Sequence, residues 1–310
     1  MSACPSVQVL LSTYNGTRYL GEFLESVRSQ RGVSVEVFTR DDGSIDGSLG
    51  VLRRYAESGG VRVVDGKNLG PAKSFLWLLE HSSPDVDFIS FADQDDVWLP
   101  DKLARATAAL GAEQRASPAM YCSSLTLVDE NLRPLGSWRG APRGASFENA
   151  LVQNIAPGCT IVINQAAREL LVSRLPTSLT MHDWWIYQAV SATGTVIVDD
   201  QSRILYRKHA INTIGAPVSV SQRVVDSWRR FVARDFRLPS LSQLLELERC
   251  FGDLWSPRQR LLVARLREAH TSRRSRVAAA FDSGLVFQST WHGIAYRILL
   301  LFGRFASSAA

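Results

Sequence analysis

The sequence predicts an α/β fold, in which helices flank a mixed but mainly parallel sheet. The first observation is a repeat of short apolar segments, each followed by a polar turn and then by apolar residues at helical spacing. The second is the largely apolar segment 88–92, which is typical of a strand buried inside a sheet. Because repeated strand-to-helix units make neighbouring strands parallel, we expect the loops after these strands to meet at one edge of the sheet.

The first half of the chain contains four predicted strands. They cover residues 7–12, 35–39, 61–64 and 88–92. A helix is predicted after each of the first three strands. The first covers about 19–27, the second ends at about residue 55, and the third covers 74–79, where the start of the helix could face a phosphate group. Further strands are expected in the second half at 120–128, at about 159–163, at 195–198 and at 204–206.

Length and cysteine content indicate a cytosolic protein with one large domain and an appendage. The 310 residues suffice for an α/β domain at 1–217 and an Arg-rich, amphipathic helical extension at 218–310. The four cysteines lie far apart without a CxxC pair, which argues against a disulfide framework. The sequence contains neither a signal-peptide pattern at its start nor an uninterrupted apolar stretch long enough to cross a membrane.

The charge is distributed unevenly along the chain. The net charge is +5, but residues 216–310 contain 15 Arg, no Lys and 7 acidic residues, which leaves residues 1–215 with 20 basic and 23 acidic residues. The basic character therefore belongs to the tail and not to a basic catalytic cleft. Such a tail indicates an anionic partner surface, either a membrane or a nucleic acid.

Three carboxylates follow the fourth predicted strand directly: Asp93, Asp95 and Asp96. Clustered carboxylates repel one another, so a cation is expected between them. Oxygen ligands without a nearby cysteine favour Mg²⁺ or Mn²⁺ over Zn²⁺. The alternative is a solvated acidic turn before a helix that begins near Pro100.

The loops after the first, second and fourth strands contain groups suited to a nucleotide. Tyr14 could stack on a base, Asp42 could accept a hydrogen bond from a pyrimidine N–H, and the acids at 93–96 could hold a metal ion on a diphosphate. Each signal is weak alone, because Asp-Asp-Gly-Ser is a common turn and a tyrosine can simply pack. Their recurrence at successive strand ends makes a nucleotide site the better interpretation.

These motifs together resemble the family 2 inverting glycosyltransferases of the GT-A fold, over about residues 7–215. Within that family, the segments 93–98 and 74–75 resemble the bacterial rhamnosyltransferase-like branch. The motifs are Ser12-Thr13-Tyr14-Asn15-Gly16, Arg40-Asp41-Asp42-Gly43-Ser44-x-Asp46, Asn68-x-Gly70 and Asp93-Gln94-Asp95-Asp96. The resemblance implies a Rossmann-like domain that binds a nucleotide-sugar with Mg²⁺ or Mn²⁺.

The resemblance also implies roles for single residues. Asp42 would contact the base, Asp93 would lie near the ribose or sugar, and Asp95 would be the direct metal ligand. The segment 206–212 resembles a Tyr-Arg-x-His-x-x-Asn segment of the family, in which His209 could bind the metal or touch the diphosphate, with Arg207 and Lys208 as alternative diphosphate contacts. The predicted nucleotide-sugar contacts are Ser12, Tyr14, Asp42, Lys73, Asp93, Gln94 and Arg207.

Asp183 is the predicted general base. Transfer of a sugar to an alcohol requires a group that takes the hydroxyl proton, and the apolar neighbours Trp184 and Trp185 would raise the pKa of Asp183. The family's catalytic Asp falls at the corresponding place. The alternative is that Asp183 caps a helix whose two tryptophans enter the core. The adjacent His182 is interpreted as an orienting or structural residue.

The leading hypothesis is a transferase that moves L-rhamnose from dTDP-β-L-rhamnose to a hydroxyl of a bacterial surface glycan. The alternatives are transfer from a UDP-hexose, a metal-dependent phosphoryl or nucleotidyl transferase, and a non-catalytic nucleotide-binding module that the tail attaches to nucleic acid. The second half of the domain supplies a candidate base for an acceptor hydroxyl, which disfavours both the phosphoryl or nucleotidyl transferase and the non-catalytic module. We therefore expect no nucleic-acid partner. The oligomeric state stays open.

The tail suggests contact with the inner face of the cytoplasmic membrane, where a lipid-linked glycan acceptor would be found. Apolar residues around Trp228 form one stripe among arginines, and the apolar segment 285–305 is interrupted by polar residues. Such a segment is a poor spanning helix and a plausible interfacial one. The alternative is a packed helical subdomain with a solvated arginine face.

Overall fold

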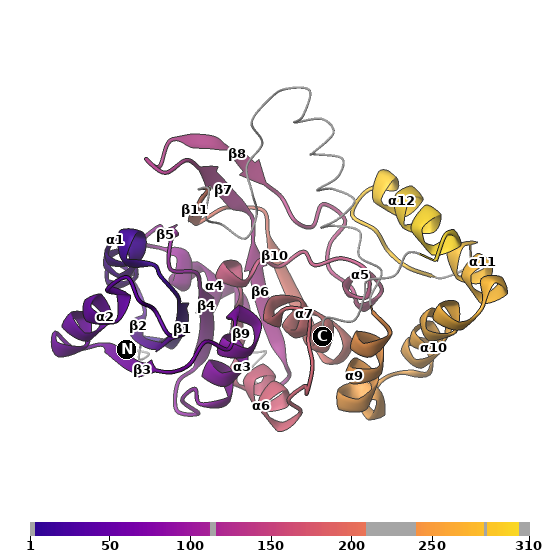
Figure 1. Cartoon of the computed structure of the whole chain (residues 1–310), viewed down its shortest axis with the longest axis horizontal. Coiled ribbons are helices and arrows are strands. Elements are labelled where there is room, and N and C mark those ends of the chain that lie inside the picture. The colour runs from indigo at the N-terminus through magenta and orange to yellow at the C-terminus, as the bar shows by residue number, and fades with distance from the viewer. Residues whose placement is uncertain (1–3, 112–115, 209–239, 282–283, 304–310) are drawn as a thin grey trace.

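The computed structural model of the chain describes residues 4–111, 116–208, 240–281 and 284–303. A seven-stranded sheet forms the centre, with helices on both of its sides, and a smaller sheet of four strands stands above it in the view of Figure 1. The predicted α/β fold class is confirmed. The boundary expected at 217/218, His209, and the apolar stripe around Trp228 lie outside the described residues.

The central sheet is parallel except for one strand. Its strands lie in the order β10-β6-β9-β4-β1-β2-β3, and β9 runs antiparallel to both β4 and β6. The bounds are β1 (Ser6–Thr13), β2 (Ser34–Asp41), β3 (Val61–Asp65), β4 (Phe88–Ala92), β6 (Ala119–Ser123), β9 (Val162–Asn164) and β10 (Thr195–Asp199). All four strands predicted in the first half are therefore present.

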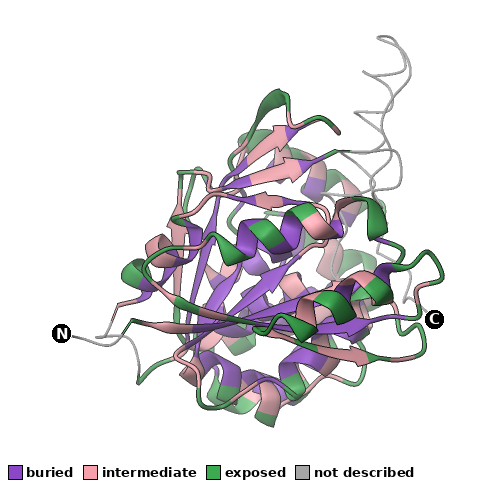
Figure 2. Ribbon diagram, turned by 90° about the vertical axis from the view of Figure 1, so that its left-hand side faces the viewer, coloured by how far each residue is buried: buried purple, intermediate pink, exposed green. Residues whose placement is uncertain are grey.

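Side chains of the central strands alternate between two layers of core, as the two-residue period of a strand requires. Leu11 of β1 belongs to the cluster that contains Phe23 of the first helix, whereas its neighbour Leu10 belongs to the cluster that contains Phe75 and Tyr187. Figure 2 shows the buried strands between helices whose outer surfaces are exposed. The helices of the α/β part are α1 (Thr17–Arg28), α2 (Ser48–Glu57), α3 (Pro71–Glu80), α4 (Lys102–Leu110), α5 (Phe147–Ala150), α6 (Gln165–Ser173) and α7 (His182–Thr193).

The C-terminal helices share one of these two cores. Trp185 of α7 packs against Phe251, with 5.6 Å between ring centroids, and Gln243 donates a hydrogen bond to the side-chain oxygen of Gln188 at 2.9 Å. The same cluster continues through Trp255 to Leu300. These helices are α9 (Leu241–Phe251), α10 (Pro257–Thr271), α11 (Arg273–Phe281) and α12 (Thr290–Leu301), with a short 3-10 turn, η3 (Gly252–Leu254). The extension is thus packed onto the α/β part over the described residues.

The prediction of a single strand at 120–128 is wrong. Residues 119–123 form β6 in the central sheet, and residues 125–128 form β7 in the smaller sheet. Ser124 lies between them, and its N–H donates to the carbonyl of Asp199 at the end of β10. The chain therefore changes sheets at one residue. The smaller sheet has the order β5-β11-β7-β8, with β5 (Val97–Trp98), β11 (Ile204–Arg207), β7 (Leu125–Val128) and β8 (Pro134–Trp138).

Within the part of the chain that the structure describes, every helix is too short or too polar to cross a bilayer.

Candidate active site

Three loops meet at the carboxyl edge of the central sheet. Thr13 of β1 pairs with Asp41 of β2, and Leu11 pairs with Ala92 at the end of β4. Because these three strands are parallel, the segments that follow them leave the sheet on the same side. The sequence-based prediction that the loops at 12–16, 40–44 and 93–96 meet at one edge is confirmed.

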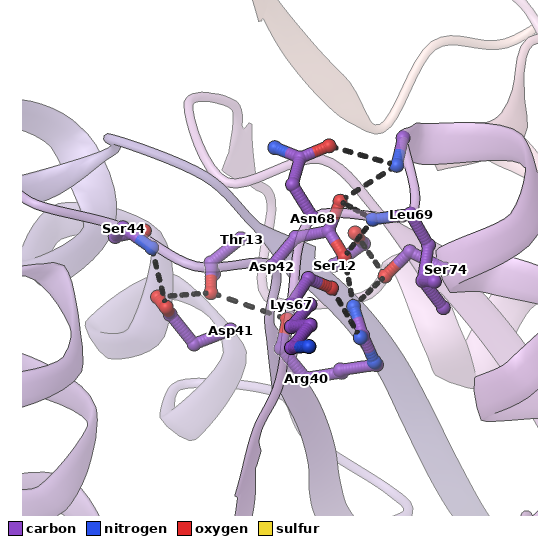
Figure 3. A network of polar contacts seen from close by, with 11 residues as sticks. Ser12, Thr13, Arg40, Asp41, Asp42, Ser44, Lys67, Asn68, Leu69 and Ser74 are labelled. Carbon is purple, nitrogen blue, oxygen red and sulfur yellow. Dashed lines mark hydrogen bonds and ion pairs between the residues drawn. The ribbon is translucent and has the colours of Figure 1, made fainter.

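Asp42 is the centre of a buried polar network (Figure 3). Its carboxylate is 2 % exposed, forms an ion pair with Arg40, and accepts hydrogen bonds from the backbone N–H groups of Leu69 and Gly70 at 3.0 and 2.9 Å. Arg40 also donates to the carbonyl of Lys67 at 2.7 Å. The carboxylate that we predicted to contact a base is therefore bonded to the loop that precedes α3.

Two other predicted nucleotide contacts lie around this network. The hydroxyl of Ser12 donates to the hydroxyl of Ser74 at 2.8 Å, which joins the end of β1 to the first turn of α3. Lys73 lies in the same turn with an exposed side chain. Because α3 begins at this edge, the positive end of its helix dipole and Lys73 are available to an anion there.

Tyr14 and Gln94 connect the first loop with the acidic loop. The backbone N–H of Tyr14 donates to the side-chain oxygen of Gln94 at 3.0 Å, and the side-chain amide of Gln94 donates back to the carbonyl of Tyr14 at 3.0 Å. A Cβ atom at Gly16 would lie 2.1 Å from the same Gln94 oxygen, so only glycine allows this approach. The Tyr14 ring remains 49 % exposed and thus accessible to a stacking base.

The acidic loop contains a compact group of possible metal ligands. One side-chain ligand atom each of Asp93, Asp96 and Cys159 lies within 4.8 Å of the others. Asp96 is 1 % exposed, and its Oδ1 atom accepts a hydrogen bond from the N–H of Arg207 at 3.2 Å. Its buried Oδ2 atom has no hydrogen-bond partner among the residues that the structure describes. A buried carboxylate oxygen in that state is suited to a cation.

The side chains of this group disfavour ionisation of one another. Burial and the neighbouring charges of Asp95 and Asp183 raise the pKa of Asp93 to about 7, and burial with the charges of Asp95 and Asp93 raises the pKa of Asp96. Burial, together with these carboxylates, also raises the pKa of the Cys159 thiol. A thiol that keeps its proton is a poor metal ligand. The available donors are therefore carboxylate oxygens, which fit Mg²⁺ or Mn²⁺.

Cys159 corrects one expectation from the sequence, which was that no cysteine lies near the acids. Cys159 lies in a 3-10 turn, η1 (Gly158–Thr160), more than 60 residues after Asp93, and is completely buried. Sequence distance therefore concealed the contact. The loop 154–163 had been predicted only as a segment that enters a strand.

Lys102 was also missed by the sequence analysis. It is the first residue of α4, its side chain is 2 % exposed, and its ammonium nitrogen lies 3.4 Å from the centre of the Trp98 ring. The ammonium donates to the hydroxyl of Ser90 at 3.2 Å. Burial lowers the pKa of Lys102 to about 7, against the opposing influence of Cys159 and Asp96. The acids thus have an amine of the chain itself in their neighbourhood, which gives up its proton more readily than an ordinary lysine.

Arg207 supports the acidic loop from the smaller sheet. Its Nε atom donates to the backbone carbonyl of Asp95 at 2.9 Å, and its other nitrogens reach the carbonyl of Glu130 and the carboxylate of Glu22. The guanidinium is buried and also lies over the ring of Tyr19. In this structure Arg207 is therefore engaged by the protein, while its predicted contact with a diphosphate stays a prediction. The same holds for Asp95 as a direct metal ligand.

Asp183 lies in the first turn of α7 and is half-buried. Its carboxylate accepts hydrogen bonds from the N–H of Trp184 at 2.6 Å, from the side chain of Asn154 and from the N–H of Gly158. Burial outweighs these bonds and raises the pKa of Asp183 to about 6. Since its charge acts on Asp93, the second half of the domain brings this carboxylate to the acidic group.

The residues around Asp183 have structural roles. Trp185 is 1 % exposed in the core, and Trp184 is 9 % exposed with its indole N–H bonded to the carbonyl of Ala150 at 2.7 Å. The part of the alternative that places both tryptophans in the core is therefore correct. Its other part is wrong, because the N-cap residue of α7 is Met181 and Asp183 is the second residue of the helix. His182 stacks on Phe75 with 4.0 Å between ring centroids, and burial lowers the pKa of His182 to about 3. A histidine that stays neutral in this way fits the predicted structural role.

Comparisons with known proteins give consistent results. A sequence model of the family described as "Glycosyl transferase family 2" matches residues 8–171. The chain is 28 % identical over 227 residues to "dTDP-rhamnosyl transferase RfbG" of Shigella flexneri. This alignment covers 67 % of this chain and 75 % of that protein. It is 33 % identical over 216 residues to the "Uncharacterized glycosyltransferase alr2836" of a Nostoc species, which covers 66 % of each chain.

A solved structure has a similar fold over most of the length of this chain. The crystal structure of S. aureus TarS 1–349 in complex with UDP-GlcNAc has a TM-score of 0.56 and covers 96 % of this chain and 90 % of that one. Sequence identity in this comparison is 16 %, so the likeness concerns the fold.

Proposed function

Because the chain belongs to glycosyl transferase family 2, we propose that it is a metal-dependent inverting enzyme that transfers L-rhamnose from dTDP-β-L-rhamnose to a hydroxyl of a bacterial surface glycan. The family makes the chain a glycosyltransferase, and the GT-A fold implied by the resemblance is confirmed. The choice of donor is supported by the similarity to a dTDP-rhamnosyl transferase over two thirds of the chain. O-antigen or capsule glycans are the acceptor class that we favour.

The observation that supports transfer most directly is the position of Asp183. A carboxylate with a pKa of about 6 lies close enough to the acidic loop to raise the pKa of Asp93. At neutral pH it is ionised, yet it binds a proton more tightly than an ordinary aspartate, as a general base requires. A nucleotide-binding module without catalysis has no use for this second carboxylate.

The reaction uses Asp183 as the proton acceptor. The acceptor hydroxyl gives its proton to Asp183 while its oxygen forms a bond to the anomeric carbon. The bond from that carbon to the diphosphate oxygen breaks, and its electron pair leaves with the nucleoside diphosphate. Because attack and departure take place on opposite faces of the sugar, the β-linked donor gives an α-linked product.

The acidic loop would hold the divalent ion. Asp95, with Asp93 and Asp96 beside it, would supply carboxylate oxygens, and His209 is a further proposed ligand. When bound, Mg²⁺ or Mn²⁺ supplies positive charge that stabilises the departing diphosphate. The remaining donor contacts are assigned to Ser12, Tyr14, Asp42, Lys73, Gln94 and Arg207.

A donor screen tests the proposal. Release of nucleoside diphosphate is measured with Mn²⁺ and either dTDP-β-L-rhamnose, UDP-hexoses or GDP-hexoses, with the Asp183→Asn enzyme as the catalytic control. Turnover of dTDP-rhamnose alone supports the assignment. Turnover of a UDP-hexose without turnover of dTDP-rhamnose would favour the second candidate, a UDP-sugar transferase, which the likeness to the UDP-GlcNAc complex of TarS brings into consideration.

The acceptor is proposed to be lipid-linked, with the enzyme at the inner face of the cytoplasmic membrane. The basic tail motivates this assignment, since 15 Arg and 7 acidic residues lie in 216–310.

A further inference from the structure

Helix α12 presents an apolar stripe to the outside of the molecule. Trp291 is 75 % exposed, and the residue that follows the helix, Phe302, is 78 % exposed. Between them, Ile294, Ile298 and Leu301 are also exposed. These residues recur at spacings of three and four, so they lie on one face of the helix. Single exposed apolar residues are ordinary, whereas a continuous stripe of this length indicates a binding surface.

The opposite face of α12 is firmly attached to the protein. Tyr296 and Leu300 are 2 % and 1 % exposed, and the Tyr296 ring packs against Phe287 with 5.0 Å between centroids. The adjacent Gln288 donates to the carbonyl of Gly144 at 2.7 Å and accepts from the N–H of Arg143 at 2.9 Å. The core side of α12 is therefore already occupied by Tyr296 and Leu300, and the exposed stripe is a second apolar face.

Positive charge is concentrated in the helices next to this stripe. The described residues 257–281 and 284–303 contain eight arginines and a single acidic residue, Glu268. Arg297 is exposed on α12 at the border of the stripe, and Arg273 and Arg274 are exposed at the start of α11, which packs against α12 at the right-hand edge of Figure 1. Helix α11 adds two exposed apolar residues, Val277 and Phe281.

We propose that this stripe, with Arg273, Arg274 and Arg297, binds the surface of a membrane that contains anionic lipid. The apolar side chains would enter the boundary between headgroups and acyl chains, with Trp291 at the depth that tryptophan prefers, and the arginines would meet lipid phosphates. A second copy of the chain fits less well, because two such faces would bring like charges together. A nucleic acid would leave the apolar stripe without a partner.

This stripe would be the part of the enzyme that contacts the membrane named in the proposed function. The observations that support it do not depend on the identity of the donor or the acceptor. It also differs from a flexible anchoring tail. Because α12 shares a core with α7, binding through α12 would fix the orientation of the whole enzyme on the bilayer.

Vesicle sedimentation of the full chain, without donor, tests the proposal. We expect the protein to pellet with phosphatidylcholine vesicles that contain about one third phosphatidylglycerol, and to be released partly by salt, because the electrostatic component alone is screened. The variant Ile294→Ser/Ile298→Ser should lose the salt-resistant component. The variant Arg273→Gln/Arg274→Gln/Arg297→Gln should bind roughly 100-fold more weakly, since each arginine contributes about fivefold.

Matched controls use exposed residues far from the stripe. Leu135→Ser changes an apolar residue that is 59 % exposed on β8, and Arg31→Gln/Arg53→Gln/Arg54→Gln removes the same charge from the α/β part. Both controls should pellet nearly as the parent does. Acyl-chain bromolipids should quench tryptophan fluorescence in the parent and much less in Trp291→Phe.

Two results would overturn the proposal. One is equal pelleting of the parent, the stripe variants and the controls. The other is an absence of vesicle binding together with a dimer in sedimentation velocity that Ile294→Ser/Ile298→Ser converts to a monomer, which would identify the stripe as an interface between copies. Neither result depends on whether the donor assignment is correct.

Discussion

Arg207 donates a hydrogen bond from Nε to the backbone carbonyl of Asp95 at 2.9 Å, and its own N–H donates to Asp96 at 3.2 Å. Strand β11 of the smaller sheet therefore determines the shape of the acidic loop that follows β4. The planar guanidinium can make several such bonds at once, which the ammonium of a lysine cannot reproduce.

We expect Arg207→Lys to weaken activation by metal about 10- to 100-fold, the usual cost of disturbing groups that orient metal ligands. A Mn²⁺ titration of transfer activity measures the change. Arg203→Lys is the control, because Arg203 pairs with Asp101 outside the acidic loop. Weaker donor binding at unchanged metal dependence would instead favour the diphosphate contact predicted from the sequence.

Asp183→Asn should lower the transfer rate by a factor on the order of 10² to 10⁴, because the variant cannot accept the acceptor's proton. Binding of the nucleoside diphosphate, measured by calorimetry with Mn²⁺, should change little. Asp253→Asn serves as a matched substitution, because Asp253 pairs with Arg174 and not with the acidic loop. Transfer by Asp183→Asn above about a tenth of the parental rate would exclude Asp183 as the base.

Transfer should decline as the pH falls through about 6, because burial raises the pKa of Asp183 to that value and only the carboxylate accepts a proton. The sign follows from the raised pKa: the inactive, protonated form persists to higher pH than in an ordinary aspartate. The profile of kcat must be recorded at saturating metal, since Asp93, whose pKa is about 7, also responds in this range. A decline that begins only near pH 4 would contradict the assignment.

Asp95→Ala should abolish transfer, and excess Mn²⁺ should not restore it, because a carboxylate ligand has been removed. The parent treated with a chelator should be equally inactive but should recover when Mn²⁺ is added. Asp101→Ala removes an acid that pairs with Arg203, and this variant should keep its metal dependence. Full activity of the chelated parent would contradict a metal requirement.

Gly16→Ala should raise the KM for the donor roughly tenfold, because the added methyl group displaces Gln94 and breaks its two hydrogen bonds to Tyr14. Gln94→Ala should have a similar effect, and the double variant should be no worse than either single one. Additive losses would show that the two residues act separately. Gly50→Ala is the control, since its Cβ would meet other atoms only at 4.0 Å.

The strand ends of the first half could be predicted from the sequence because the local pattern specifies them. The apolar runs that end near Thr13, Asp41 and Ala92 made it possible to foresee which loops share an edge. A helix at the position of α7 was predicted only in the alternative in which Asp183 caps it and its two tryptophans enter the core. The tryptophans do lie in the core, since a side chain next to a base is not obliged to face the substrate.

Contacts between distant residues could not be predicted in the same way. Cys159 and Lys102 are single buried polar residues without a periodic pattern, and only the folded sheet brings them to the acids. The division of residues 120–128 between two sheets could not be predicted, because the segment remains apolar on both sides of Ser124, where the chain changes sheets. The sequence also could not show which face of α12 is exposed, since both of its faces are apolar.

The core that joins Trp185 to Phe251 and Leu300 has a consequence for synthesis on the ribosome. The strands of the central sheet are complete once β10 has emerged, but the apolar side of α7 lacks its cover until the last helices follow. At about 5–20 residues per second, this interval lasts roughly 5 to 22 seconds. During that time a nascent chain displays the apolar surface around Trp185, so chaperone occupancy should peak after α7 emerges and fall when α12 is released.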